Sequence, residues 1–160
     1  MTAQTGWSDE RRVWDAFKYF GADLSWQKVP FDPHVLHRVP AHASGVYLVC
    51  ARPPAEPLAP LNAYTVLYAG QVKQSAHGLR ARFREHLKRP ADALRGFKEC
   101  YYPDVHFWFA PVDGRRLIDD LEGLLIEAFN PPCNKVGAPG SRTLLGRLGA
   151  GVPLGAPAMA

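Results

Sequence analysis

The sequence predicts a small α/β protein with three strands and two amphipathic helices in the central part of the chain. Three short runs, 44–51, 64–69 and 105–112, are rich in β-branched and aromatic residues, as strands are. Two longer segments, 79–89 and 115–129, repeat apolar residues every three or four positions, as amphipathic helices do. A chain of 160 residues is long enough to bury one core.

Glycine and proline mark the ends of the predicted strands. The first strand, 44–51, has a glycine, Gly45, at its entry, and the Pro- and Ala-rich segment 52–62 that follows it is expected to be a loop. The second strand ends at Gly70, where the backbone turns sharply and a ligand can approach closely. Consecutive strands joined by a loop most simply pair antiparallel. The third strand, 105–112, is aromatic on both faces and is therefore expected to lie inside the sheet.

The segment 79–89 predicts a basic helix that follows the second strand. Arg82 and His86 stand four residues apart and therefore share one face of this helix. Five Lys or Arg residues between Leu79 and Pro90 outnumber the single acid, Glu85. Two interpretations remain open, a solvated basic helix and a phosphate-binding site. The buried stripe consists of residues at a spacing of four: Leu79, Phe83 and Leu87.

The helix predicted at 115–129 carries a carboxylate on a mostly apolar face. Glu122 has an isoleucine four residues before it, Ile118, and another four residues after it, Ile126. Burying a carboxylate is costly unless it is paired or holds a metal ion. Glu122 either reaches water at the edge of the stripe or forms a cation site from one protein oxygen and waters, as magnesium often does. The apolar stripe consists of Leu117, Leu121, Leu124, Leu125 and Ala128.

The ends of the chain predict extensions to this core. Residues 1–43 are expected to form an N-terminal helix at 8–20 and a Pro-rich arm with one helical turn after Pro33. Residues 44–136 would form the central domain. Residues 137–160, rich in Gly, Ala and Pro, would form a C-terminal tail.

The composition favours a polyanionic partner and a reducing compartment. The net charge is +4, which suits nucleic acid or a phosphorylated metabolite without separating the two. The three cysteines, Cys50, Cys100 and Cys133, are odd in number and far apart in the sequence. They match neither a disulfide framework nor a zinc spacing, so we expect reduced thiols in a cytoplasm. The sequence shows no signal peptide and no run of eighteen apolar residues, so no membrane partner is expected.

Four motifs stand in one order along the chain. They are Gly45-Val46-Tyr47, then Tyr68-Ala69-Gly70, then Arg82 with His86, then Glu122 followed by apolar residues, prolines and Asn134. Each motif is short, but together and at this spacing they resemble the GIY-YIG nuclease domain from about Gly45 to Asn134. The resemblance implies a three-stranded antiparallel sheet with flanking helices. It also implies hydrolysis of phosphodiester bonds, with DNA as the expected substrate and with 5′-phosphate and 3′-hydroxyl ends as products.

The same resemblance implies a catalytic role for five residues. Glu122 would hold one Mg²⁺ or Mn²⁺ ion, and Arg82 would clamp the scissile phosphate with its guanidinium fork. Tyr47 would position or deprotonate the attacking water, and Tyr68 would complete the water site. A tyrosine with an ordinary pKa near 10 needs a nearby cation to act as a base at neutral pH. His86 would handle a second proton or contact the phosphate.

Further polar residues near the motifs are expected to bind substrate: Gln71, Lys73, Arg80, Arg84, Lys88 and Asn134. Some members of the family carry a lysine where this chain has Gln71, and Lys73 is a substitute for that contact. His77, in the longer loop before the basic helix, is within reach of substrate. Asn134 is expected mainly to orient the chain near the site.

Two other classes of function fit the same sequence. One is a non-cutting module that binds nucleic acid or a protein through the basic face, although binding alone does not require Glu122. The other is an enzyme that uses the same pocket on a small substrate. The family usually relies on attached domains to choose its target, so this chain is expected either to act alone with its extensions or to work as a homodimer.

Overall fold

The computed structural model describes residues 24–51, 65–73, 77–89, 95, 105–129, 131, 133 and 134. In chain order the elements are strand β1 (Gln27–Pro30), 3₁₀ helix η1 (Pro33–Arg38), strand β2 (Gly45–Ala51), strand β3 (Thr65–Val72), helix α2 (Gly78–Lys88), strand β4 (Val105–Pro111) and helix α4 (Arg115–Phe129). The helix predicted at 8–20, the loop at 52–62 and the tail at 137–160 lie outside these residues. None of the helices in the described ranges is long and apolar enough to cross a membrane.

The strands form one antiparallel sheet in the order β1-β4-β2-β3. The three predicted strands and the helices predicted at 79–89 and 115–129 are confirmed, and so is the antiparallel pairing of β2 with β3. The predicted count of three strands is wrong, because β1 adds a fourth strand from the arm. In β1 only Val29 is buried, opposite Phe107, and the strand ends at Pro30. A four-residue edge strand has too few alternating positions to show in the sequence, and an edge tolerates proline.

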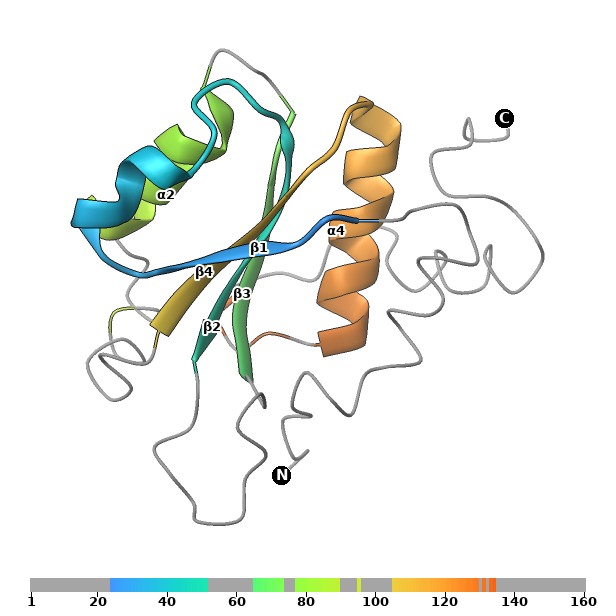
Figure 1. Cartoon of the computed structure of the whole chain (residues 1–160). Helices are drawn as coiled ribbons and strands as arrows, with labels where there is room; N and C mark the ends of the chain where they lie inside the picture. Colours follow the sequence, from blue (N-terminus) through green and yellow to red (C-terminus); the bar gives the residue numbers. More distant parts are fainter. Residues whose placement is uncertain are drawn as a thin grey trace, which may run out of the picture.

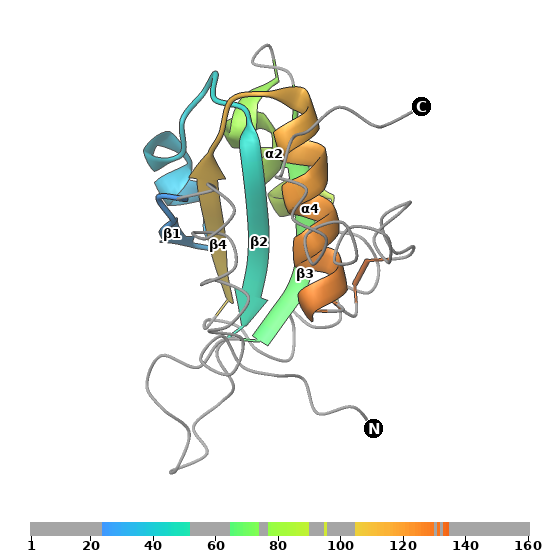
Figure 2. The ribbon, with the colours of Figure 1, turned by 90° about the vertical axis from the view of Figure 1, so that its right-hand side faces the viewer.

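Helices cover both faces of the sheet, α2 with η1 on one side and α4 on the other (Figures 1 and 2). Strand β2 is buried along its whole length. Its alternate residues, such as Tyr47 and Val49, pack under α2, whereas Val46 and Leu48 pack under α4. The α2 face of the sheet therefore holds one core cluster, and it also holds the tyrosine of the first motif.

The register of β2 and β3 brings the two glycine-containing motifs together. Tyr47 pairs with Gly70, and Val49 pairs with Tyr68. Because side chains alternate along a strand, Tyr68 and Gly70 share the face of Tyr47. The pairing then shifts at a bulge that leaves Leu67 without a partner residue on β2.

The start of α2 is held by the segment that follows η1. The backbone N–H of Leu79 donates to the Ala43 carbonyl, and that of Arg80 donates to the Pro40 carbonyl. These bonds satisfy two of the free donors at the beginning of the helix. Gly78 has a φ of +47° and approaches so closely that a Cβ there would lie 2.0 Å from the Ala41 carbonyl oxygen. The arm thus fixes where α2, with Arg82 and His86, begins.

Candidate active site

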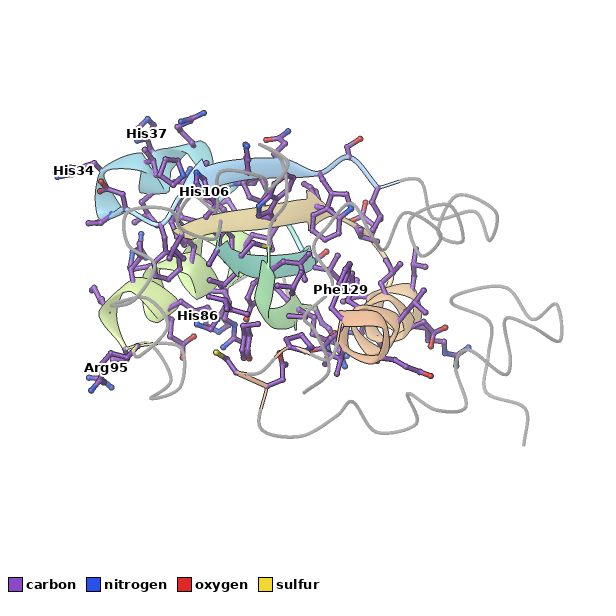
Figure 3. All side chains as sticks on the ribbon, turned by 90° about the horizontal axis from the view of Figure 1, so that it is seen from below. His34, His37, His86, Arg95, His106 and Phe129 are labelled. Atoms are coloured by element: carbon purple, nitrogen blue, oxygen red, sulfur yellow. The ribbon has the colours of Figure 1, made fainter. Side chains whose placement is uncertain are left out.

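A buried hydrogen bond joins the first motif to the basic helix. The Tyr47 hydroxyl lies 2.9 Å from His86 Nε2, although the two residues are 39 positions apart in the sequence. Tyr47 is 2% exposed and His86 is 9% exposed. Figure 3 shows His86 between α2 and the sheet, whereas His34 and His37 lie apart from it on η1. Both side chains are therefore almost entirely buried, and the packing of α2 on the sheet holds them.

Residues of β3 complete the surroundings of this pair. The Tyr68 ring lies 6.1 Å from the Tyr47 ring and 5.0 Å from the His86 ring, measured between ring centroids. A Cβ on Gly70 would lie 2.3 Å from the Tyr47 hydroxyl oxygen. Only a glycine leaves room there, so the glycine of the second motif admits the tyrosine of the first.

Burial keeps both partners of the hydrogen bond uncharged at neutral pH. It lowers the pKa of His86 from 6.5 to about 4, and the Arg82 charge contributes in the same direction. Burial, followed by the charge of Tyr68, raises the pKa of Tyr47 well above its usual value. In the tautomer with hydrogen on Nδ1, the neutral imidazole accepts the Tyr47 hydroxyl proton at Nε2. His86 is thus placed as a proton acceptor for Tyr47.

Arg82 lies on the exposed face of α2, one helical turn before His86. Its Nη1 forms an ion pair with Glu85 Oε2 at 2.9 Å. The positive charge of Arg82 lowers the pKa values of Tyr47, His86 and Glu122. Arg82 is therefore close enough to act electrostatically on the buried pair and on the carboxylate of α4, while its guanidinium remains accessible.

Glu122 is partly buried on α4, and its carboxylate acts on the same cluster. Burial raises the pKa of Glu122, and the Asp119 carboxylate raises it further, whereas Lys73, Gln71 and Arg82 oppose that rise. The Glu122 charge in turn raises the pKa of Tyr47. The charges of Arg82 on α2 and of Glu122 on α4 thus both act on Tyr47 of β2.

A divalent cation fits the surroundings of Glu122. A carboxylate that is destabilised by burial and by a second carboxylate, Asp119, is one that a bound cation would relieve. No group of three or more His, Cys, Asp or Glu residues gathers in the described part of the chain. Mg²⁺ commonly uses one or two carboxylates and takes its other ligands from water and substrate phosphate. The oxygen ligands present here suit that mode of binding.

Asp119 connects α4 to the end of β3. Its Oδ1 accepts a hydrogen bond from Gln71 Nε2 at 3.0 Å and forms an ion pair with Lys73 Nζ at 2.5 Å. Since Asp119 is one helical turn before Glu122, these contacts keep Lys73 and Gln71 beside the Glu122 carboxylate. Two of the predicted substrate-binding residues are therefore held at the site.

An open cavity of about 300 Å³ lies between the end of β3 and α2. A second hollow, of about 160 Å³, adjoins this cavity along α2. A third, of about 300 Å³, adjoins the second and is lined in part by Arg84 and Lys88. The first cavity is lined by Gln71, Val72, Lys73, His77 and Arg82. Cationic side chains are thus accessible from the candidate site to the end of the basic helix.

Comparison of the chain with protein-family models, with curated proteins and with solved structures finds no match. A functional proposal therefore depends on the side chains of the site and on the chemistry that they permit.

Two of the predicted substrate-binding residues make structural contacts. Arg80 donates from Nε to the Val39 carbonyl at 2.7 Å and from Nη2 to the His37 carbonyl at 3.0 Å, and so it ties η1 to α2. The Asn134 amide pairs with the backbone of Ala69, accepting from its N–H and donating to its carbonyl, both at 2.9 Å. These contacts support the expectation that Asn134 orients the chain, and they engage part of the Arg80 guanidinium away from substrate.

Two acidic residues of the site were not predicted from the sequence. Glu85 pairs with Arg82, and Asp119 holds Lys73. The available signals were weak: Glu85 is the single acid in a basic helix, and Asp119 precedes Glu122 by one helical turn. Neither spacing distinguishes a solvated surface acid from one that holds a functional cation.

Proposed function

We propose that the protein is a metal-dependent endonuclease, a stand-alone member of the GIY-YIG nuclease family. It would hydrolyse phosphodiester bonds in DNA and leave 5′-phosphate and 3′-hydroxyl ends. The observation that carries the proposal is the buried 2.9 Å hydrogen bond between Tyr47 and His86. Arg82 and Glu122, from two other elements, act electrostatically on Tyr47.

The Tyr47–His86 pair supports a proton relay. Because the pKa of Tyr47 is raised, its phenolate is disfavoured and the hydroxyl stays protonated before reaction. As the attacking water gives a proton to the Tyr47 oxygen, the hydroxyl proton would pass to the neutral His86 at Nε2. The water oxygen bonds to phosphorus, the bond to the 3′ oxygen breaks, and that oxygen takes a proton from solvent. Tyr47 ends neutral and His86 ends protonated.

Arg82 and Glu122 supply charge at the two other places where the reaction needs it. Arg82 would leave Glu85 and bind the scissile phosphate through two parallel N–H groups. Glu122 would hold Mg²⁺ or Mn²⁺ together with waters, and the ion, when bound, would stabilise the charge that develops on the leaving oxygen. The raised pKa of Glu122 supports this role, because a carboxylate with that environment favours a cation partner.

The exposed cations of α2 support a nucleic acid as the substrate. Arg84 and Lys88 line a hollow along the helix, beyond the cavity that Lys73 and Arg82 line. A non-cutting module has no need of a buried Tyr47–His86 pair. A second candidate is an enzyme for a small phosphorylated substrate, because a cavity of about 300 Å³ is of the size that holds a small ligand.

The proposal is tested by incubating plasmid DNA, single-stranded DNA and RNA with Mg²⁺ or Mn²⁺. We expect metal-dependent cutting by the wild type and a loss of about 10²-fold or more in Glu122→Ala and in Arg82→Ala. Arg116→Ala, which removes an exposed arginine at the start of α4, is the matched control and should cut normally. A folded wild type that leaves all three substrates intact would contradict the proposal, and so would variants as active as the wild type.

A further inference from the structure

We propose that Glu85 and Asp119 take the place of two phosphate groups in the ligand-free protein, and that the cavity between Arg82 and Lys73 binds two consecutive phosphates of a polynucleotide. The inference rests on the proposed nuclease function, because it specifies what that site would bind. It also adds a property, an internal competition between carboxylates and phosphates for the same two cations.

The contact of Arg82 with Glu85 is the first half of this arrangement. The two side chains are 44% and 61% exposed and lie three residues apart on α2. An exposed ion pair of this kind is weak, and competing with it lowers the binding constant of a ligand by about two- to fivefold. A phosphodiester accepts the same parallel N–H groups as a carboxylate and is therefore able to displace Glu85.

The contact of Lys73 with Asp119 is the second half. Here too the side chains are partly accessible, at 37% and 48% exposed, and Gln71 donates to the same carboxylate oxygen. The pair joins Lys73, the residue after β3, to α4, so it lies in other parts of the chain than the first pair. Each cation of the cavity thus has its own carboxylate partner.

The position of the two carboxylates explains why two phosphates are needed. Arg82 and Lys73 line one cavity, whereas Glu85 lines the adjoining hollow farther along α2 and Asp119 approaches from α4. A ligand with one phosphate displaces one carboxylate at a time. A polynucleotide presents phosphates at every nucleotide, so one molecule displaces both carboxylates and gains both cations.

The experiment measures binding without metal, so it does not depend on cleavage. The probes are a short fluorescent single-stranded oligonucleotide and inorganic phosphate, tested against wild type, Glu85→Gln, Asp119→Asn and the double variant. Each single variant should bind the oligonucleotide about two- to fivefold more tightly, and the double variant by about the product of the two factors. For inorganic phosphate, the double variant should gain no more than about fivefold.

The control removes the same charge elsewhere. Asp113→Asn changes an exposed acid in the turn before α4 and should leave both affinities within about twofold of wild type. The inference is overturned if Glu85→Gln and Asp119→Asn raise the affinity for the oligonucleotide no more than this control does, or if their effects do not combine in the double variant. It is also overturned if no variant binds the oligonucleotide. If the predicted binding pattern is seen but wild type cuts no nucleic acid, the nuclease proposal fails and the phosphate-binding cavity stands.

Discussion

Burial decides the protonation of the candidate catalytic residues. His86 is 9% exposed, and burial lowers its pKa to about 4. Between pH 6.5 and about 4 the imidazole is therefore neutral in the folded protein, whereas in the unfolded chain, with a pKa of 6.5, it takes up a proton. Between these two pH values the unfolded chain binds more protons, and stability therefore rises with pH. The contribution is fully present above pH 6.5 and is lost as the pH falls through about 4.

This argument predicts the acid sensitivity of the fold. On lowering the pH from 6.5 to about 4, the wild type should lose about 3 kcal/mol more unfolding free energy than His86→Gln, which does not titrate. Urea denaturation of both proteins across this range measures the difference. Parallel pH profiles for wild type and variant would show that His86 is not held neutral by the fold.

Gly70 makes a second prediction at the residue scale. In Gly70→Ala the new Cβ would lie 2.3 Å from the Tyr47 hydroxyl oxygen and 2.4 Å from Cζ, so the ring must move away from His86. Overpacking of this kind costs about 1–3 kcal/mol. We expect lower thermal stability together with loss of nuclease activity. A variant that is as stable and as active as wild type would contradict the close contact.

At the scale of elements, one arginine of α2 holds the helix to the arm and another faces solvent. Arg80 bonds to the carbonyls of His37 and Val39, whereas Arg84 is exposed and lines a surface hollow. Two positions that look equivalent in a basic helix therefore have different tasks. The docking of η1 on α2 depends on the first of them.

The pair of variants Arg80→Met and Arg84→Met separates these tasks. Arg80→Met should lower the unfolding free energy by about 1.5–3 kcal/mol, because hydrogen bonds from a charged donor are lost and carbonyls are left unpaired. Arg84→Met should leave stability within about 0.5 kcal/mol and weaken binding to DNA instead. Denaturation and DNA binding are measured on both. Equal stability of the two variants would show that Arg80 is not a support for η1.

At the scale of the whole molecule, charge distinguishes a polynucleotide from a small substrate. The net charge is +4, and Lys73, Arg82, Arg84 and Lys88 line hollows that follow α2. When a protein neutralises several phosphates, counterions are released from the nucleic acid. This release becomes less favourable as the salt concentration rises, so the binding weakens steeply. A small substrate with one phosphate has a much smaller dependence.

We therefore expect the affinity for a DNA duplex to fall steeply between about 50 and 200 mM salt. Arg84→Ala and Lys88→Ala should each reduce the slope of log affinity against log salt by about 1. Titration of labelled duplex at several salt concentrations measures both effects. An affinity that stays flat with salt would favour the small-substrate enzyme over the nuclease.

The elements whose periodicity is complete within one segment could be predicted from the amino-acid sequence alone. The strands β2, β3 and β4 and the helices α2 and α4 show in their apolar patterns, because burial repeats every two residues in a strand and every three or four in a helix. The order of the motifs also comes from the sequence. Local periodicity is sufficient for these predictions, because each element buries one of its own faces.

The tertiary structure decided which residues meet. It made a strand of 27–30 by pairing it with β4, joined Tyr47 to His86 across 39 positions, and used Arg80 to hold η1. It also placed Glu85 and Asp119 on the two cations of the cavity. These contacts depend on the register of strands and on the packing of helices against a shared sheet. Apart from Arg82–Glu85, which lie three residues apart on α2, each contact joins residues of different segments, and no single segment contains that information.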